Sequence, residues 1–203
     1  MSVCVMLDVD GVVVTGHPHD GRSWAADIEQ DLGITPQDLQ QHFFIPHWKA
    51  IVVGEKRLDT VLEDCLPRLA PDLTPQDFMA YWFARDARLE EDVLADCDLL
   101  RARGVKVFLA TNQEHFRARH LMEMLGLSSR VDGIVYSAQV GAKKPQRAFF
   151  DAALSLAGSM PETTFLVDDT RANVDAARAA GWAACHWTGE QRLLELLETA
   201  RAG

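Results

Sequence analysis

Short apolar runs recur along the chain, and polar residues follow each of them. Residues 3–7 are wholly apolar and rich in β-branched side chains, and Asp8 follows them directly. Similar runs occupy residues 105–110, 133–136, 164–167 and 183–187. Continuous apolar runs of this length are typical of strands that are buried on both faces of a sheet. The pattern therefore predicts five buried strands.

Helical stretches separate these runs after residue 88. Residues 91–103 end at Gly104, and residues 114–125 end at Gly126, which is where a helix commonly stops. Strands that alternate with helices indicate a parallel sheet covered by helices on both sides. We therefore predict an α/β fold with a Rossmann-like core.

Residues 15–88 break this alternation, because they contain helical patterns and no convincing strand. Two similar segments, residues 35–39 and 74–78, each place Thr at a helix N-cap and Pro at the first helical position. Apolar residues also repeat at helical spacing, namely Leu58, Val61, Leu62, Cys65, Leu66 and Leu69. We expect a core made of residues 1–14 and 89–203, with residues 15–88 inserted as an α-helical cap subdomain.

Composition narrows the classes of partner. The 203 residues are 48% hydrophobic and carry a net charge of −10, which argues against binding to nucleic acid or to an anionic membrane surface. No apolar window approaches the length of a membrane span, and we expect a cytoplasmic protein, either monomer or homodimer. The four cysteines lack metal-site spacing and are expected to be small buried hydrophobic residues.

Polar residues with chemical potential stand where the predicted strands end. They are Asp8 and Asp10 with Gly11, then Thr111 and Asn112, then Lys144, and finally Asp168 and Asp169. Each of these residues also has an ordinary structural explanation when it is considered alone. The acids of the first loop could be turn residues, Thr111 and Asn112 could be helix caps, and Lys144 could be a surface lysine. In an open parallel sheet, however, ligands bind beyond the carboxyl ends of the strands, so all of them are expected at one edge. Two adjacent buried carboxylates repel each other unless a cation or a proton lies between them, and their oxygen atoms suit Mg²⁺.

At this point the sequence resembles the haloacid dehalogenase-like (HAD) hydrolase superfamily over nearly its whole length. The four motifs occur in order as Asp8-Val9-Asp10-Gly11-Val12, Thr111-Asn112, Lys144-Pro145 with Phe149 or Phe150 downstream, and Asp168-Asp169-Thr170-Arg171-Ala172-Asn173. The helical insertion between the first two motifs resembles the cap of the subfamily I branch.

The resemblance implies a role for each matching residue. Asp8 is expected to be the nucleophile, and Asp10 the general acid that later becomes the base. Thr111 with Asn112, together with the loop at Gly11, is expected to bind the phosphoryl group, and Lys144 to neutralise its charge, with Lys143 as the fallback. The resemblance implies that Asp8, Asp168, Asp169 and the backbone carbonyl of Asp10 hold Mg²⁺, with Asn173 in support.

The implied function is a magnesium-dependent phosphatase that hydrolyses a small phosphorylated metabolite, such as a sugar phosphate, through an aspartyl-phosphate. A phosphomutase of the same superfamily stays open as an alternative. A 2-haloacid dehalogenase is disfavoured, because those enzymes lack the second acid and need no magnesium. A receiver domain is disfavoured, because it carries its acidic pair after the first strand and has no cap. An inactive binding protein on the same scaffold is also disfavoured, because all the expected polar residues are in place. The sequence leaves the substrate and the cap residues that contact it open.

Overall fold

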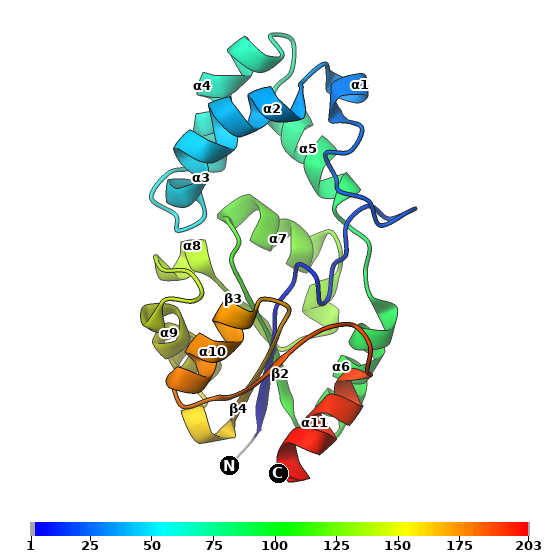
Figure 1. The fold of residues 1–203 in the computed structure, drawn as a ribbon, viewed down its shortest axis with the longest axis vertical. Coiled ribbons are helices and arrows are strands. Elements are labelled where there is room, and N and C mark those ends of the chain that lie inside the picture. Colours follow the sequence, from blue (N-terminus) through cyan, green and yellow to red (C-terminus); the bar gives the residue numbers. More distant parts are fainter. Residues whose placement is uncertain (1–2, 203) are drawn as a thin grey trace.

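The computed structural model describes residues 3–202 and the side chains of residues 3–198. Five parallel strands form one sheet in the order β3-β2-β1-β4-β5 (Figure 1). They are β1 (Cys4–Leu7), β2 (Lys106–Thr111), β3 (Gly133–Tyr136), β4 (Thr164–Asp168) and β5 (Ala183–His186). Each lies within one residue of its predicted bounds at either end. The predicted α/β fold is thus confirmed.

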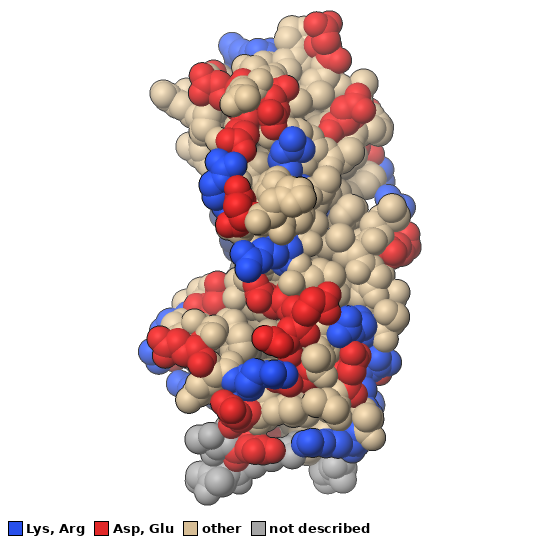
Figure 2. All heavy atoms as spheres, turned by 90° about the vertical axis from the view of Figure 1, so that its right-hand side faces the viewer, with Lys and Arg blue, Asp and Glu red and all other residues tan. Residues whose placement is uncertain are grey.

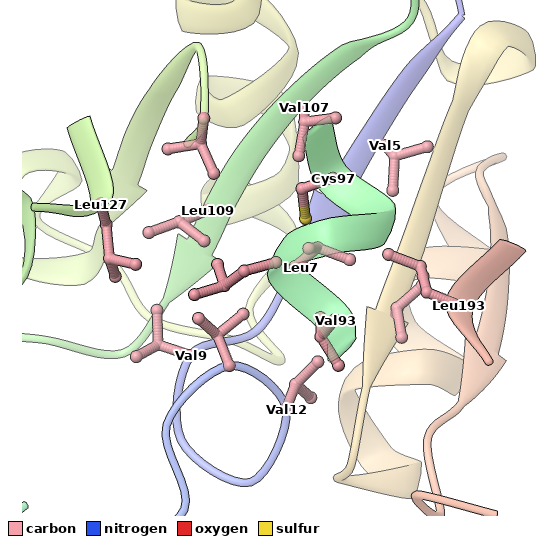
Figure 3. Close-up of a cluster of buried hydrophobic side chains, with 14 of the residues drawn as sticks. Val5, Leu7, Val9, Val12, Val93, Cys97, Val107, Leu109, Leu127 and Leu193 are labelled. Atoms are coloured by element: carbon pink, nitrogen blue, oxygen red, sulfur yellow. The ribbon is translucent and has the colours of Figure 1, made fainter. Parts of the chain in front are cut away.

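Helices cover both faces of this sheet. Successive side chains of a strand point to opposite faces, so these largely apolar strands place apolar side chains on both faces, and both must be covered. Leu7, Leu109 and Val167 belong to a hydrophobic cluster on one face, which Figure 3 shows in close-up. This face is covered by α6 (Glu91–Ala102), α7 (His115–Glu123) and α11 (Leu193–Ala202). Met6 and Leu166 point to the other face, which is covered by α9 (Arg147–Ala157) and α10 (Arg171–Ala179). The remaining short elements are η2 (Leu127–Ser129), α8 (Ser137–Val140) and η3 (Pro161–Thr163).

The segment between β1 and α6 is helical and has a hydrophobic cluster of its own. It contains α1 (Ile28–Leu32), α2 (Pro36–Leu39), α3 (Ile45–Ile51), α4 (Leu58–Leu69) and α5 (Pro75–Arg85), with a π-helical turn, η1 (Gln40–Phe44), joining α2 to α3. These helices lie beyond the carboxyl edge of the sheet (Figure 1). Residues 15–88, all of which are described, form no strand. We refer to them below as the insertion.

Local chemistry explains where two of these helices begin. Thr35 and Thr74 cap α2 and α5, since each hydroxyl accepts a hydrogen bond from the backbone N–H three residues later, at 3.0 and 3.1 Å. Trp24, Trp48 and Trp82 pack together inside the insertion, with the rings of Trp24 and Trp82 stacked at 4.8 Å. The expected capping is confirmed, and aromatic packing helps to hold the insertion together.

The two ends of the insertion pair with each other as they leave the core. Val14 and Leu89 form an antiparallel bridge, and the Thr15 N–H donates to the Arg88 carbonyl at 2.9 Å. The Gly16 carbonyl accepts from the N–H groups of Ala87 and Arg88, both at 3.0 Å. Both connections therefore leave the core at one point, close to Asp8 and Asp10.

Two expectations from composition can also be compared with the structure. The four cysteines are free thiols, three of them buried and Cys185 half-buried. Among the residues described here, no helix combines the length and the apolar character that crossing a bilayer requires.

Candidate active site

Three carboxylates meet at the carboxyl edge of the sheet. Asp8 follows β1, and Asp168 and Asp169 stand at the end of β4, the strand beside it. One oxygen from each residue lies within 4.8 Å of the other two. Asp8 and Asp168 are buried, while Asp169 is exposed. Three convergent hard oxygen donors are the ligand set that suits Mg²⁺, so these residues fit the ion that the sequence implied.

Asp168 is fixed by its neighbours on α10. Asn173 donates from Nδ2 to both carboxylate oxygens of Asp168, at 3.0 and 3.2 Å, and the Thr170 N–H donates to Oδ1 at 2.9 Å. These donors hold a fully buried carboxylate in one orientation. Asn173 thus lies where the sequence placed it, beside the acidic pair.

The loop after β1 passes directly over Asp169. Gly11 has a φ of 80°, in the left-handed region, and a Cβ built on it would lie 2.2 Å from Asp169 Oδ2. Both the backbone conformation and the close approach therefore favour glycine at this position, because any other residue would be strained and would displace the Asp169 carboxylate. The structure places Gly11 against the acidic pair.

Lys144 is a buried cation between two of the carboxylates. Its Nζ lies 2.9 Å from Asp8 Oδ1 and 2.6 Å from Asp168 Oδ2, and the residue is 2% exposed. Burial by itself lowers the pKa of Lys144, but the charges of Asp8 and Asp168 outweigh it and raise that pKa above its ordinary value. Lys144 therefore stays protonated. Lys143 is half-buried, and its backbone N–H bonds to Gln146.

Asn112 holds the backbone of Lys144 in place. Its Nδ2 donates to the Lys144 carbonyl at 3.0 Å, and its Oδ1 accepts from the Lys144 N–H at 2.8 Å. From the sequence alone, this amide was expected to donate to phosphate oxygens. In the structure one N–H of Nδ2 and the Oδ1 atom bind the Lys144 backbone and position the lysine, and the second N–H of Nδ2 takes no part in this pair.

The Thr111 hydroxyl is buried and forms no hydrogen bond with the described part of the chain. The residue stands at the end of β2 and is fully buried. An unpaired buried hydroxyl is costly, and native proteins seldom retain one without a ligand or water nearby. Its place at the same edge as Asp8 suits a donor to a bound oxyanion.

Asp10 lies at the base of the insertion, where its side chain is partly open to water but has protein groups around it. Gln113 donates to its Oδ2 at 2.7 Å. Burial raises the pKa of Asp10 to about 7, and the nearby charges of Asp86 and Asp8 add to this effect. Burial likewise raises the pKa of Asp8. A carboxyl group with such a pKa can hold a proton near neutral pH and release it again.

Gln113 and Arg117 also belong to the site, although the sequence did not indicate them. Arg117 is 2% exposed, and its guanidinium donates to the carbonyls of Phe83 and Asp86 and lies 3.4 Å from the Asp86 carboxylate. It thereby ties α7 to the end of the insertion. Only Gln113 had a usable signal, since it directly follows Thr111-Asn112 at a strand end.

One flank of the site is strongly acidic. A cavity of about 740 Å³ extends from Gly11 and Asp169 along α6 and the loop before α11, and five further carboxylates line it, from Glu90, Asp92, Asp96, Glu190 and Glu195. Figure 2 shows acidic side chains gathered on this face of the core. A negative surface of this kind attracts cations and repels anionic groups.

Comparison with solved structures places the fold. The HAD family enzyme bt-2542 from Bacteroides thetaiotaomicron, solved in complex with magnesium and inorganic phosphate, superimposes with a TM-score of 0.79 at 15% identity, covering 97% of this chain and 99% of that one. The L-2-haloacid dehalogenase from Xanthobacter autotrophicus gives a TM-score of 0.64 at 19% identity, covering 100% and 84%. At these identities the likeness concerns the fold.

Sequence comparison gives the family. The ribulose-1,5-bisphosphate 5-phosphatase of Halopiger xanaduensis is 30% identical over 89% of this chain and 82% of its own length. The GMP/IMP nucleotidase YrfG of Escherichia coli is 24% identical over 89% of this chain and 80% of its own length. The match to the phosphoglycolate phosphatase of Aquifex aeolicus spans only 39% of that relative. The model of the haloacid dehalogenase-like hydrolases matches residues 3–181, and the chain belongs to this hydrolase family.

Proposed function

We propose that this protein is a magnesium-dependent phosphatase that hydrolyses a small phosphorylated metabolite through a covalent phosphate ester on Asp8. The observation that carries the proposal is the cluster of Asp8, Asp168 and Asp169 oxygens within 4.8 Å, with the Lys144 ammonium against two of these carboxylates. Phosphoryl transfer depends mainly on positive charge and in-line positioning, and this cluster supports both.

In the first half-reaction, a carboxylate oxygen of Asp8 attacks the phosphorus atom. The bond from phosphorus to the leaving oxygen breaks, and Asp10 gives its proton to that oxygen. Thr111 donates its unpaired hydroxyl to a phosphoryl oxygen, and Lys144 balances the negative charge that gathers around Asp8. Asn112 and Asn173 keep Lys144 and Asp168 in position.

In the second half-reaction, Asp10 takes a proton from a water molecule, which then attacks the phosphorus atom and releases Asp8. The pKa of Asp10, raised to about 7, suits both directions of transfer. Asp8, Asp168, Asp169 and the carbonyl of Asp10 would hold Mg²⁺, which supplies the charge that lets a phosphate dianion approach several carboxylates.

The relatives support the substrate class. Their names describe phosphatases of small phosphate monoesters, including a nucleotidase and a sugar bisphosphate phosphatase. The full set of polar residues, Asp10 and the acidic pair included, favours phosphate chemistry over dehalogenation. A phosphomutase uses the same first half-reaction and differs only in what accepts the phosphoryl group.

The test is hydrolysis of an aryl phosphate with Mg²⁺ and with EDTA, followed by mass spectrometry of peptides from acid-quenched enzyme. We expect turnover only with Mg²⁺, a phosphate adduct on Asp8, and loss of both in Asp8→Asn. Steady release of inorganic phosphate, rather than return to an acceptor, separates a phosphatase from a mutase. Full activity in EDTA, or an adduct on another residue, contradicts the mechanism.

We also propose that residues 15–88 act as a cap over the site, on a core formed by residues 1–14 and 89–203. The paired crossings at Val14 and Leu89 support this, since both ends of the insertion start beside the reacting carboxylates. Replacing residues 15–88 with a short Gly/Ser linker should lower kcat/KM for a metabolite far more than for a small aryl phosphate. Circular dichroism must first show that the truncated protein folds. Equal losses of kcat/KM for both substrates would show that the cap has no part in substrate specificity.

A further inference from the structure

A second cavity, of about 270 Å³, lies between the insertion and the core at the carboxyl end of β3. The insertion lines it with Lys56 and Arg57, from the segment before α4, and the core lines it with His115, Phe116, Arg119 and Tyr136. Three of these side chains are cationic in a protein whose net charge is −10. We refer to this cavity as the basic pocket.

The cations of the basic pocket come from both sides of the boundary. The guanidinium groups of Arg57 and Arg119 lie 5.5 and 5.4 Å from the ring centre of the same side chain, Phe116. Asp59 binds Arg57 through both carboxylate oxygens, at 3.0 and 2.6 Å. Lys56 and Arg119, by contrast, have no ion pair with any carboxylate among residues 3–198. Like charges gathered in this way repel unless an anion neutralises them.

The one carboxylate that also lines the cavity is already in use. Glu114 is 2% exposed and accepts hydrogen bonds from the backbone N–H groups of Phe116 and Arg117, where it caps α7. Two further polar groups complete the lining, since His115 Nδ1 lies 3.3 Å from the Tyr136 hydroxyl. The pocket therefore holds two unpaired cations, one partly neutralised arginine and further hydrogen-bonding groups.

The pocket shares its sheet edge with Asp8. Tyr136 is paired in register with Thr111 on β2, and β1 is the next strand in the sheet. Neighbouring strands lie about 4.8 Å apart, so the end of β3 lies roughly 10 Å from the end of β1. A phosphate at Asp8 and an anion in the basic pocket could thus belong to one small molecule.

We propose that the basic pocket binds an oxyanion, a phosphate or carboxylate group, that bridges Lys56 of the insertion and Arg119 of the core. The anion comes either from the distal end of the substrate or from a separate small effector. Only the first source rests on the proposed function. In either case the bound anion holds the insertion against the core, since its two partners belong to different sides of the boundary.

The experiment uses ligands that cannot be hydrolysed, so that it reports on binding whether or not the protein is a phosphatase. Titration calorimetry with Mg²⁺ present compares pentane-1,5-diyl bisphosphonate with pentylphosphonate in wild type, Lys56→Gln, Arg119→Gln and the control Arg68→Gln. Arg68 is exposed near the far end of α4, so its replacement removes the same charge away from the pocket. A second arm titrates sulfate into protein saturated with pentylphosphonate, at constant ionic strength.

If the substrate supplies the anion, the bisphosphonate binds the wild type more tightly than the monophosphonate. Each pocket variant then reduces this ratio by up to about fivefold, as expected for an exposed ion pair, and Arg68→Gln leaves it unchanged. If an effector supplies the anion, the ratio is near one, but sulfate still binds the wild type and not the pocket variants. The proposal would be overturned if the wild type showed no preference for the bisphosphonate and no sulfate binding. It would also be overturned if Arg68→Gln changed binding as much as the pocket variants do. Loss of phosphatase activity alone would leave it standing.

Discussion

Replacing Lys144 with methionine tests whether one buried cation holds the active site together. Methionine keeps most of the length of the side chain but removes its charge. In the wild type the Lys144 Nζ lies 2.9 Å from Asp8 Oδ1 and 2.6 Å from Asp168 Oδ2, and its side chain is 0% exposed. In the variant two buried carboxylates face each other without their shared partner.

The expected loss of stability is large. Removing one member of a buried ion pair costs about 3–5 kcal/mol, because the remaining charge stays buried without compensation. Two carboxylates lose their cation here, so we expect the upper part of that range in the presence of a chelator. For a chain of this size that loss lowers Tm by roughly 10–20 °C. Turnover of an aryl phosphate should fall by about 10²-fold or more, because the positive charge beside Asp8, the proposed nucleophile, is gone.

The loss should depend on pH in a defined direction. Burial already raises the pKa of Asp8 to about 6, and removal of Lys144 raises it further. A carboxyl group whose folded-state pKa is raised stabilises the fold below its ordinary pKa of about 4 and loses this contribution as the pH rises through the folded value. The deficit of Lys144→Met should therefore be smaller at pH 5 than at pH 8.

Urea unfolding, followed by circular dichroism in EDTA at both pH values, measures this deficit. Lys143→Met is the matched control, since it removes the same charge one residue earlier. Added Mg²⁺ should stabilise Lys144→Met more than the wild type, because the cation relieves a stronger carboxylate repulsion. Wild-type stability of Lys144→Met in EDTA at pH 8, or an equal loss in Lys143→Met, would refute the reasoning.

Three further substitutions test other contacts of the site. Gly11→Ala should lower stability by about 2 kcal/mol and weaken Mg²⁺ binding in calorimetry about tenfold or more, because its Cβ meets Asp169. Gly33→Ala is the control, because Gly33 has a similar φ of 70° and open space around it. This control should lower stability by about 1 kcal/mol and leave Mg²⁺ affinity unchanged. Equal Mg²⁺ affinities in the two variants would speak against the Asp169 contact. Asp10→Asn should reduce kcat by about 10²-fold with the fold intact, and an unchanged kcat would exclude it as the acid. Arg117→Met should cost about 3–5 kcal/mol in urea unfolding, whereas Arg101→Met, which breaks a half-exposed pair with Asp132, should cost under about 1 kcal/mol. Similar losses in these two arginine variants would show that burial of Arg117 adds nothing.

The sequence predicted the sheet and the edge where its polar residues gather, because both follow from local patterns. A continuous apolar run sets each strand, and the residues that follow it must then lie at the carboxyl edge. Contacts between distant segments carry no such pattern. Gln113 reaches Asp10 across 103 positions of sequence, and Arg117 reaches Asp86 across 31.

Asn112 illustrates the same limit at a residue that the sequence did identify. Its place after β2 suggested a donor to phosphate, and the structure adds a contact that the sequence did not indicate, from the same amide to the backbone of Lys144, 32 positions away. An amide can donate and accept at once, so its position alone does not decide its partner. The contact depends on how closely the end of β2 approaches the loop before α9, which only the folded chain determines.

The paired crossings at Val14–Gly16 and Ala87–Leu89 have an evolutionary consequence. The chain leaves and re-enters the core through this one pair of crossings, which we call the neck. The distance between the two ends of the insertion at the neck is therefore the same whatever the length of the insertion. Segments of different size and shape can therefore be exchanged at this neck without rebuilding the sheet, provided that the new segment again supplies acceptors for the buried guanidinium of Arg117, as Phe83 and Asp86 do here. Recombination at this neck could supply new recognition surfaces to one unchanged chemical centre, and chimeras joined between Gly16 and Ala87 offer a direct way to reproduce that process in the laboratory.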